Sequence, residues 1–376
     1  MQSYLFPNYA RKPFEISSGK ECYVTDSNGK TYLDFTSGIG VMNLGYSQTS
    51  LDEVLVNQAE KIWHSPNLYL SDLQEKLAEK LSYADEYLGF FCNSGAEANE
   101  AAIKLARKAT GKSKIISFKN SFHGRTYGSM SATGQEEVHQ GFAPLVPDFS
   151  YLTYNDSQIK EAITDQTAAV ILELVQGEGG VTVAKKDWIA ELVKLCKELD
   201  VLIIVDEVQT GIGRTGTLYA FEQFDFEPDI FTLAKGLGNG FPIGAMFGKK
   251  ELADSFGPGS HGSTFGGNKL AMAVGNQVLD LISPILNTIS AKSELLFKEL
   301  NKIQSDKIVE IRGLGLMVGI ELKADVPVAD ILTKLEQKGL LALKAGSNTL
   351  RLLPPLVISE EEIIVGTNKI AEVLTE

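Results

Sequence analysis

The sequence predicts an α/β protein with a mostly parallel central sheet, helices on both faces of that sheet, and a smaller α+β domain. Two observations lead to this class. In the middle of the chain, short aliphatic runs alternate with segments of helical spacing, and such runs are typical of strands buried on both faces. In the last third, long helical segments occur together with strand-like segments, which is typical of a separate α+β unit.

The first predicted element is a hairpin over residues 20–35, because two alternating segments flank the turn sequence Asp26-Ser27-Asn28-Gly29. Helical spacing then predicts helices over residues 72–83, 97–108 and 188–199. Apolar runs predict strands over residues 88–92, 113–118, 168–175, 201–205 and 229–233.

The last third changes character. Long helices are predicted over residues 269–286 and 291–303, and strands within residues 308–322 and 342–353. The glycines of Gly313-Leu314-Gly315 fit a tight bend between strands. We therefore expect three parts: an N-terminal segment that packs with the small domain, a large α/β domain and a C-terminal small domain. Their boundaries are residues 1–45, 46–266 and 267–376.

Composition limits the classes of function. The chain has 376 residues, 44% of them hydrophobic, and a formal net charge of −13, so disorder and non-specific nucleic-acid binding are not expected. Three cysteines and four histidines are scattered, which favours neither a metal site nor a disulfide framework. The N-terminus has no signal-peptide pattern, and no apolar run is long enough to span a membrane. We expect a soluble, cytoplasmic protein.

The aliphatic run 201–205 ends in the carboxylates of Asp206 and Glu207. Ligands of open parallel sheets bind at the carboxyl ends of the strands, so Asp206 lies where a binding site is expected. A buried carboxylate there needs a partner, and a protonated ring nitrogen would serve. The alternative is a solvated strand end or a structural ion pair.

The next predicted strand, 229–233, runs into Lys235 and a glycine-rich loop. Burial can lower the pKa of a lysine at this edge and make its amine a nucleophile. A surface lysine is the simpler interpretation. The functional one gains weight because two successive strands bring Asp206 and Lys235 to the same edge.

Three further segments have side chains suited to a phosphorylated, planar ligand and its substrate. Ser94-x-x-Glu97 has the form of a capping box, and a helix start there offers free N–H groups to a phosphate. Phe122 can stack on a ring, and Arg125 can hold a carboxylate. The loop 261–268 is rich in small and hydroxyl residues. Each segment also has an ordinary structural explanation.

Residues 211–216 match the pattern G-x-G-x-x-G. In a dinucleotide-binding fold these glycines follow the strand directly and open a helix. Here five residues separate them from the apolar run, and no βαβ unit follows. The sequence therefore argues against nicotinamide binding at this segment.

As an ordered set, these segments resemble the class III, ω-amino-acid branch of the pyridoxal-phosphate aminotransferases. The resemblance runs from the N-terminal hairpin to the last strand. One departure is Tyr46, where relatives often have histidine after the glycine. The matching motifs are Asn93-Ser94-Gly95-Ala96-Glu97-Ala98-Asn99-Glu100, Phe122-His123-Gly124-Arg125-Thr126, Gln176-Gly177-Glu178-Gly179-Gly180, Asp206-Glu207-Val208-Gln209-Thr210-Gly211, Ala234-Lys235-Gly236, Ser263-Thr264-Phe265-Gly266-Gly267-Asn268 and Arg351-Leu352-Leu353-Pro354-Pro355-Leu356.

The resemblance implies the PLP-dependent transferase fold type I, pyridoxal 5′-phosphate as cofactor, and a homodimer with shared active sites. It implies that Lys235 binds the cofactor covalently and then shuttles the proton, while Asp206 keeps the ring nitrogen protonated. The other implied cofactor contacts are Gly95 and Ala96 to the phosphate, Phe122 to the ring face, Gln209 to the phenolic oxygen and Thr264, from the neighbouring subunit, to the phosphate.

The implied substrate contacts are Arg125, Ser263 and Arg351. Arg351 would receive the α-carboxylate of glutamate or 2-oxoglutarate, and Glu178 would mask it while an ω-amino donor is bound. The expected reaction moves the δ-amino group of N2-acetylornithine to 2-oxoglutarate. Ornithine, 4-aminobutyrate and succinyl-diaminopimelate remain alternative donors. An aminomutase is a more remote alternative, and a non-enzymatic module would require an inert Lys235.

Overall fold

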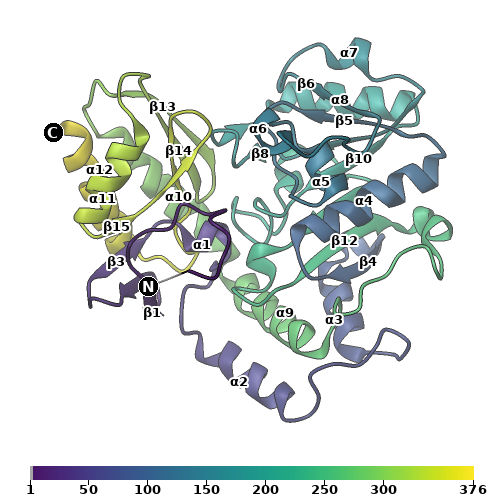
Figure 1. The fold of residues 1–376 in the computed structure, drawn as a ribbon, viewed down its shortest axis with the longest axis horizontal. Helices are drawn as coiled ribbons and strands as arrows, with labels where there is room; N and C mark the ends of the chain where they lie inside the picture. Colours follow the sequence, from purple (N-terminus) through teal and green to yellow (C-terminus); the bar gives the residue numbers. More distant parts are fainter. Residues whose placement is uncertain (1–2) are drawn as a thin grey trace.

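The computed structural model describes residues 3–376, so residues 1 and 2, the start of the predicted N-terminal segment, lie outside the described residues. Figure 1 shows a large body around a long sheet and a smaller body that contains the C-terminal helices. The purple N-terminal strands lie beside the smaller body. No helix within residues 3–376 has the length and apolar character needed to cross a membrane.

The large body is built on a seven-stranded sheet, and its predicted class is confirmed. Its strand order is β4-β12-β11-β10-β7-β5-β6. Strand β12 pairs antiparallel with both neighbours, and the remaining pairs are parallel. The strands span Tyr87–Cys92 (β4), Gly244–Lys249 (β12), Ile230–Leu233 (β11), Leu202–Asp206 (β10), Thr167–Leu172 (β7), Lys114–Phe118 (β5) and Phe149–Leu152 (β6).

Helices cover both faces of this sheet because successive strand residues point to opposite sides. In β10, Ile204 packs in a cluster with Ala101 and Leu105 of helix α4 (Gly95–Thr110). Val205 packs in another cluster, which contains residues of helix α8 (Lys186–Glu198). Helices α2 (Thr49–Ala59) and α3 (Asp72–Leu81) pack against α9 (Lys269–Ile282).

The N-terminal strands form a second sheet in the order β1-β2-β3-β15. Strands β2 (Tyr23–Asp26) and β3 (Thr31–Asp34) form the predicted hairpin, and β1 (Ile16–Lys20) adds an unpredicted strand to it. Strand β3 also pairs with β15 (Leu340–Leu341) from the C-terminal part. The hairpin is therefore hydrogen-bonded to the smaller body.

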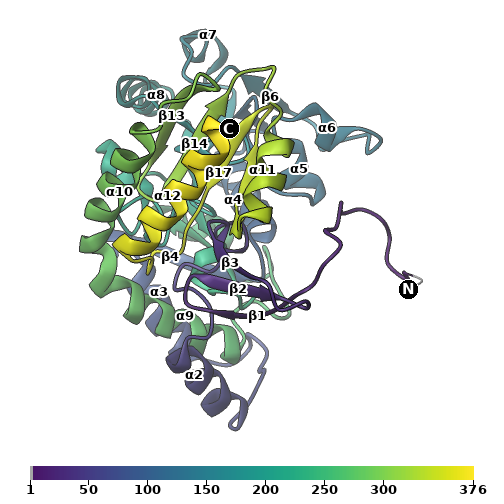
Figure 2. The same ribbon diagram turned by 90° about the vertical axis from the view of Figure 1, so that its left-hand side faces the viewer.

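The smaller body contains a four-stranded sheet in the order β13-β14-β17-β16. Figure 2 shows helix α12 in front of this sheet, between α10 and α11. The strands are β13 (Ile308–Leu314), β14 (Met317–Leu322), β17 (Thr349–Leu352) and β16 (Leu343–Ala345), and the helices are α10 (Leu286–Asn301), α11 (Val328–Gln337) and α12 (Glu360–Thr375).

Two predicted elements are interrupted in the structure. The strand predicted over 168–175 ends at Leu172, and Val175–Gln176 (β8) instead pairs with Thr182–Val183 (β9). The helix predicted over 269–286 ends at Ile282, and a 3-10 turn over Ser283–Ile285 leads into α10. Proline at position 284 explains this break, since it cannot donate the helical hydrogen bond.

Candidate active site

Asp206 is the last residue of β10, and its side chain is buried. Its Oδ2 accepts a hydrogen bond from Asn99 Nδ2 at 2.7 Å and lies 2.8 Å from His123 Nδ1. Its Oδ1 accepts from the Val208 N–H at 3.0 Å. The buried carboxylate thus has the partners that its desolvation requires.

The groups around Asp206 are themselves held by hydrogen bonds. Asn99 Nδ2 also donates to the His123 carbonyl at 2.7 Å, and Asn99 Oδ1 accepts from the Thr232 hydroxyl at 2.8 Å. The His123 N–H donates to Thr133 Oγ1 at 2.9 Å. His123 Nε2 is buried without a hydrogen-bond partner among residues 3–376. These contacts fix the imidazole against the carboxylate.

Lys235 follows β11 and has a positive φ of 44°. Asp206 is paired in register with Thr232 of β11, which precedes Lys235 by three residues. The side chains of Asp206 and Lys235 therefore lie at the same edge of the sheet, and both line one cavity of about 450 Å³. Burial lowers the pKa of Lys235, and the nearby Arg351 adds to this effect, while Glu178 and Asp206 oppose it. A lysine in this setting holds its proton less tightly than a surface lysine does.

The start of helix α4 forms another wall of the same cavity. Ser94 caps the helix, because its hydroxyl accepts the Glu97 N–H at 3.2 Å. The predicted capping box is incomplete: the Glu97 carboxylate instead accepts two bonds from Asn93, at 2.8 Å each. Gly95 and Ala96 line the cavity with the N–H groups of a helix start, which suit a phosphate.

Gly95 also satisfies a steric requirement of the cavity. A Cβ atom at this position would lie 2.7 Å from Val208 Cγ1, a closer approach than packed side chains allow. Val208 follows β10 and also lines the cavity, as does Phe122. One cavity therefore contains a carboxylate, an aromatic ring, a lysine and a helix start, and this donor set fits a phosphorylated pyridine ring.

Arg351 of β17 approaches the cavity from the smaller body. Its Nη1 donates to Glu178 Oε1 at 2.7 Å, to the Gly177 carbonyl at 2.9 Å and to Gln209 Oε1 at 3.2 Å. The side chain of Arg351 is 3% exposed, whereas that of Glu178 is 32% exposed. Glu178 is therefore the partner that can swing into solvent while Arg351 stays in place.

Arg125 is exposed at the edge of the cavity, and its guanidinium carbon lies 5.5 Å from the centre of the Phe122 ring. Eight of the eleven predicted site residues line one cavity, namely Lys235, Asp206, Gly95, Ala96, Phe122, Gln209, Arg125 and Glu178. Arg351 is hydrogen-bonded to two of them, Glu178 and Gln209.

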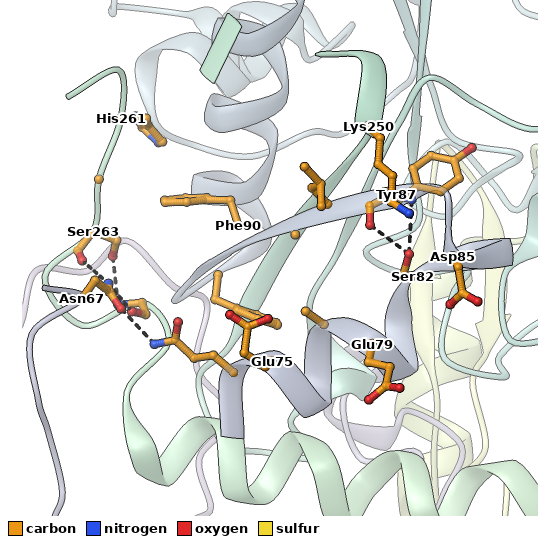
Figure 3. Close-up of a pocket in the computed structure, with 17 residues that line it drawn as sticks. Asn67, Glu75, Glu79, Ser82, Asp85, Tyr87, Phe90, Lys250, His261 and Ser263 are labelled. Carbon is orange, nitrogen blue, oxygen red and sulfur yellow. Dashed lines mark hydrogen bonds between the residues drawn. The ribbon is translucent and has the colours of Figure 1, made fainter. Parts of the chain in front are cut away.

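Ser263 and Thr264 are placed differently. Thr264 is exposed and does not line this cavity. Ser263 lines a second cavity of about 700 Å³, and its Oγ reaches the first cavity only through Asn93 Nδ2 at 3.2 Å. Figure 3 shows this second cavity between the loop with His261 and Ser263 and the helix with Glu75 and Glu79.

Sequence reasoning missed Glu173, which directly follows β7, whereas Asp206 is the last residue of β10; both line the same cavity. Its carboxylate accepts the N–H groups of Phe122 at 3.0 Å and Gly177 at 3.4 Å. Burial raises its pKa to about 7, with the charge of His123 opposing the shift. The signal was available, since a carboxylate also ends this aliphatic run. The partners of Asp206, namely Asn99 and His123, carried no comparable signal.

The glycine pattern at 211–216 does not open a helix. The segment after β10 is a series of turns, and the next element is the 3-10 helix Ala220–Phe224. The segment 211–216 therefore does not have the helix start that a dinucleotide-binding turn requires.

Comparison with known proteins gives consistent matches. The model of the class III aminotransferase family matches residues 5–374. The acetylornithine aminotransferase of Listeria monocytogenes serovar 1/2a is 55% identical over 366 residues, which cover 96% of this chain and 94% of the relative. That of Bacillus subtilis strain 168 is 50% identical, covering 99% of this chain and 98% of the relative.

Two solved structures show how similar the folds are. The ornithine aminotransferase of Toxoplasma gondii superposes with a TM-score of 0.93 at 33% identity, covering 99% of this chain and 91% of that one. The N-acetylornithine aminotransferase of Stenotrophomonas maltophilia K279a superposes with a TM-score of 0.84 at 37% identity, covering 97% and 96%.

Proposed function

The chain belongs to the class III aminotransferases, and from this premise we propose that it transfers the δ-amino group of N2-acetyl-L-ornithine to 2-oxoglutarate. The products are N-acetyl-L-glutamate 5-semialdehyde and L-glutamate, and the reaction is a step of arginine biosynthesis. The enzyme depends on pyridoxal 5′-phosphate. Near-full-length relatives at 50–55% identity that bear the name acetylornithine aminotransferase support this function.

The single observation that carries the proposal is the shared cavity of Asp206 and Lys235. The bound cofactor would supply an electron-withdrawing ring that stabilises negative charge on the carbon bearing the amine. Asp206 would hold the proton on the ring nitrogen, with Asn99 and His123 fixing the carboxylate. Gly95 and Ala96 would donate their N–H groups to the phosphate, Phe122 would stack on the ring, and Gln209 would lie near its phenolic oxygen.

Lys235 would bind the cofactor covalently and afterwards move a proton at its Nζ atom. Both tasks require an unprotonated amine for part of the cycle. Burial, which lowers the lysine pKa, increases the unprotonated fraction at neutral pH. The positive φ of Lys235 indicates that the surrounding structure holds this residue in an unfavourable backbone conformation.

Arg351 and Glu178 would adapt one site to two kinds of substrate. The amino donor reacts at its terminal amine, and 2-oxoglutarate reacts at its α-carbon. With Glu178 paired, Arg351 is neutralised; with Glu178 turned away, Arg351 can bind the α-carboxylate. Arg125 and Ser263 would contact the substrate. An aminomutase needs no second amino acceptor, so this pair favours a transaminase.

We further propose a cytoplasmic homodimer in which Thr264 reaches the phosphate in the partner's site. Thr264 is exposed on its own chain, which is consistent with a role across an interface. Phe265, next in sequence, is also 63% exposed. Two further exposed apolar side chains, Trp63 at 66% and Leu68 at 88%, adjoin His64 and Asn67, which contact this loop. Such surface typically marks an interaction site. The three cysteines are buried and free, which suits a reducing compartment.

A donor panel tests the substrate. We expect N-acetylornithine to give the highest kcat/KM with 2-oxoglutarate, above ornithine, 4-aminobutyrate and succinyl-diaminopimelate. A higher value for ornithine would replace the proposed donor. A Lys235→Ala variant should lose the visible absorbance of the covalently bound cofactor. Glutamate formation without added 2-oxoglutarate would contradict the transaminase assignment.

A further inference from the structure

Arg214, in the glycine pattern 211–216, is a fully buried cation that forms no ion pair with the described residues 3–376. Its guanidinium is instead bound by neutral oxygens. Nη1 donates to the carbonyls of Leu316 at 3.0 Å and Pro354 at 2.6 Å, and Nη2 donates to Asn43 Oδ1 at 2.7 Å. A buried charge without a carboxylate is costly, so its place in the fold needs an explanation.

The three acceptors of Arg214 come from three separate parts of the chain. Asn43 belongs to the segment after the N-terminal hairpin, Leu316 lies in the turn between β13 and β14, and Pro354 follows β17. Arg214 itself lies in the loop after β10. Its own carbonyl accepts the Leu316 N–H at 3.0 Å, so main chain and side chain bind the same turn.

Asn43 connects Arg214 to the loop that contains Lys235. Its Nδ2 donates to the Ile212 carbonyl at 2.9 Å. The side chain lies directly against Gly236, because a Cβ atom there would be 2.3 Å from Asn43 Nδ2. Gly236 follows Lys235, whose backbone already has a positive φ of 44°. The amide that Arg214 orients therefore supports the residue next to the lysine.

Pro354 connects Arg214 to the segment of chain that carries Arg351. It lies three positions after Arg351, on the chain leaving β17. Leu353, between them, is bound by the N-terminal segment: its carbonyl accepts the Ser37 hydroxyl at 2.5 Å, and its N–H donates to the Phe35 carbonyl at 2.7 Å. Arg214 thus contacts the supports of both Lys235 and Arg351 while lying outside the cavity lining.

We propose that Arg214 is a positioning residue that fixes the Arg351 strand relative to Lys235. Arginine suits this task because its planar fork presents several donors at fixed angles, whereas a lysine ammonium is a flexible point donor. The inference rests on the proposed role of Arg351. It assigns Arg214 to the 2-oxoglutarate half-reaction in particular, since Arg351 is masked by Glu178 when the amino donor reacts.

The test compares the two half-reactions of an Arg214→Lys holoenzyme, each followed by the cofactor spectrum in single turnovers. Binding of glutarate, a dicarboxylate that cannot react, is titrated by the same spectrum. We expect the half-saturation constant for 2-oxoglutarate and the Kd for glutarate to rise about tenfold or more, as for a misplaced binding group. The half-reaction with N-acetylornithine should change less than about twofold.

Arg107→Lys is the matched control. Arg107 also donates to two backbone carbonyls, those of Ser113 at 2.9 Å and Pro147 at 2.7 Å, but it lies at the far end of α4. Both half-reactions should remain unchanged in this variant. If Arg214→Lys changes both half-reactions equally, or changes neither, Arg214 is only structural and the proposal is overturned.

Two further variants complete the test. If Arg214→Lys does not fold, Arg214→Gln takes its place, because its amide keeps a donor near the carbonyls of Leu316 and Pro354 and leaves the bond from Asn43 to Ile212 intact. The same selective loss of 2-oxoglutarate and glutarate binding is expected. Unchanged binding in Arg214→Gln would then overturn the proposal. Arg351→Lys distinguishes the proposed role of Arg351 from that of Arg214. Unchanged glutarate binding in Arg351→Lys would refute the role of Arg351. Weaker glutarate binding in Arg351→Lys, together with unchanged binding in Arg214→Lys, would refute only the positioning role of Arg214.

Discussion

Replacing Glu178 by alanine should shift the preference of the enzyme between its two kinds of amino donor. In the structure the carboxylate pairs with Arg351 at 2.7 Å and so neutralises the group that would bind an α-carboxylate. Without it, Arg351 is available at all times. Glutamate, which presents an α-carboxylate next to its amine, should therefore become a better donor relative to N-acetylornithine.

The magnitude follows from the exposure of the pair. A hydrogen bond to a charged group contributes about 1.5–3 kcal/mol. Since Glu178 is about one-third exposed while Arg351 is buried, solvent screening places this pair at the lower end, about 1.5 kcal/mol. That free energy corresponds to about a tenfold change in the ratio of kcat/KM for N-acetylornithine to that for glutamate.

The assay measures both values from single turnovers of the holoenzyme with each donor. Glu178→Gln retains an acceptor oxygen but loses the charge, so its shift should be smaller than that of Glu178→Ala. Glu372→Gln removes the carboxylate from an exposed pair with Lys338 and serves as the control. A ratio that stays at the wild-type value in Glu178→Ala would refute the masking role of Glu178.

Three further predictions concern stability and cofactor binding. Burial raises the pKa of Glu207 to about 7, so the folded protein binds a proton at this group more tightly than the unfolded chain does. The free energy of unfolding should therefore fall by about 3 kcal/mol at most as the pH rises from about 4.5 to about 7. Glu207→Gln should flatten this part of the dependence of unfolding free energy on pH, as measured by urea titrations. Gly95→Ala should weaken cofactor binding about tenfold, because the added Cβ meets Val208, whereas Gly257→Ala has open space and should leave the fluorescence-measured Kd unchanged. Asp206→Asn should lower kcat at least about a hundredfold at saturating cofactor, and a decrease of only a few-fold would contradict its role in holding the ring proton.

The strand-end rule located the centre of the site from sequence alone. Asp206 and Lys235 follow aliphatic runs, and parallel strands bring such positions to one edge. The same rule did not locate Glu173, because the apolar residues on both sides of it suggested a strand that continued to residue 175. In the structure two N–H groups bind its carboxylate where β7 ends.

Other features depend on contacts between distant parts of the chain, which local patterns do not encode. Arg351 meets Glu178 across 173 positions of sequence, and only the resemblance to a family suggested the pair. The network of Asn99 and His123 around Asp206 joins a helix, a loop and a strand. Strand β1 was not expected, because its residues are mostly exposed and show no apolar alternation.

The reversed direction of β12 has a consequence for how this scaffold tolerates change in length. Antiparallel neighbours can be joined by a short return, whereas parallel neighbours need a long crossover. The lysine therefore sits on the brief link 234–243, anchored at both ends by adjacent strands of one sheet. Most residues of this link are buried, so an insertion there would displace packed backbone beside the lysine. In the longer excursion 207–229 between β10 and β11, residues 207–221 are mostly buried and include Arg214, whereas Asp225 and Glu227 are exposed. Natural or engineered length variation should therefore spare the first link and the start of the second, and accumulate near residues 225–227.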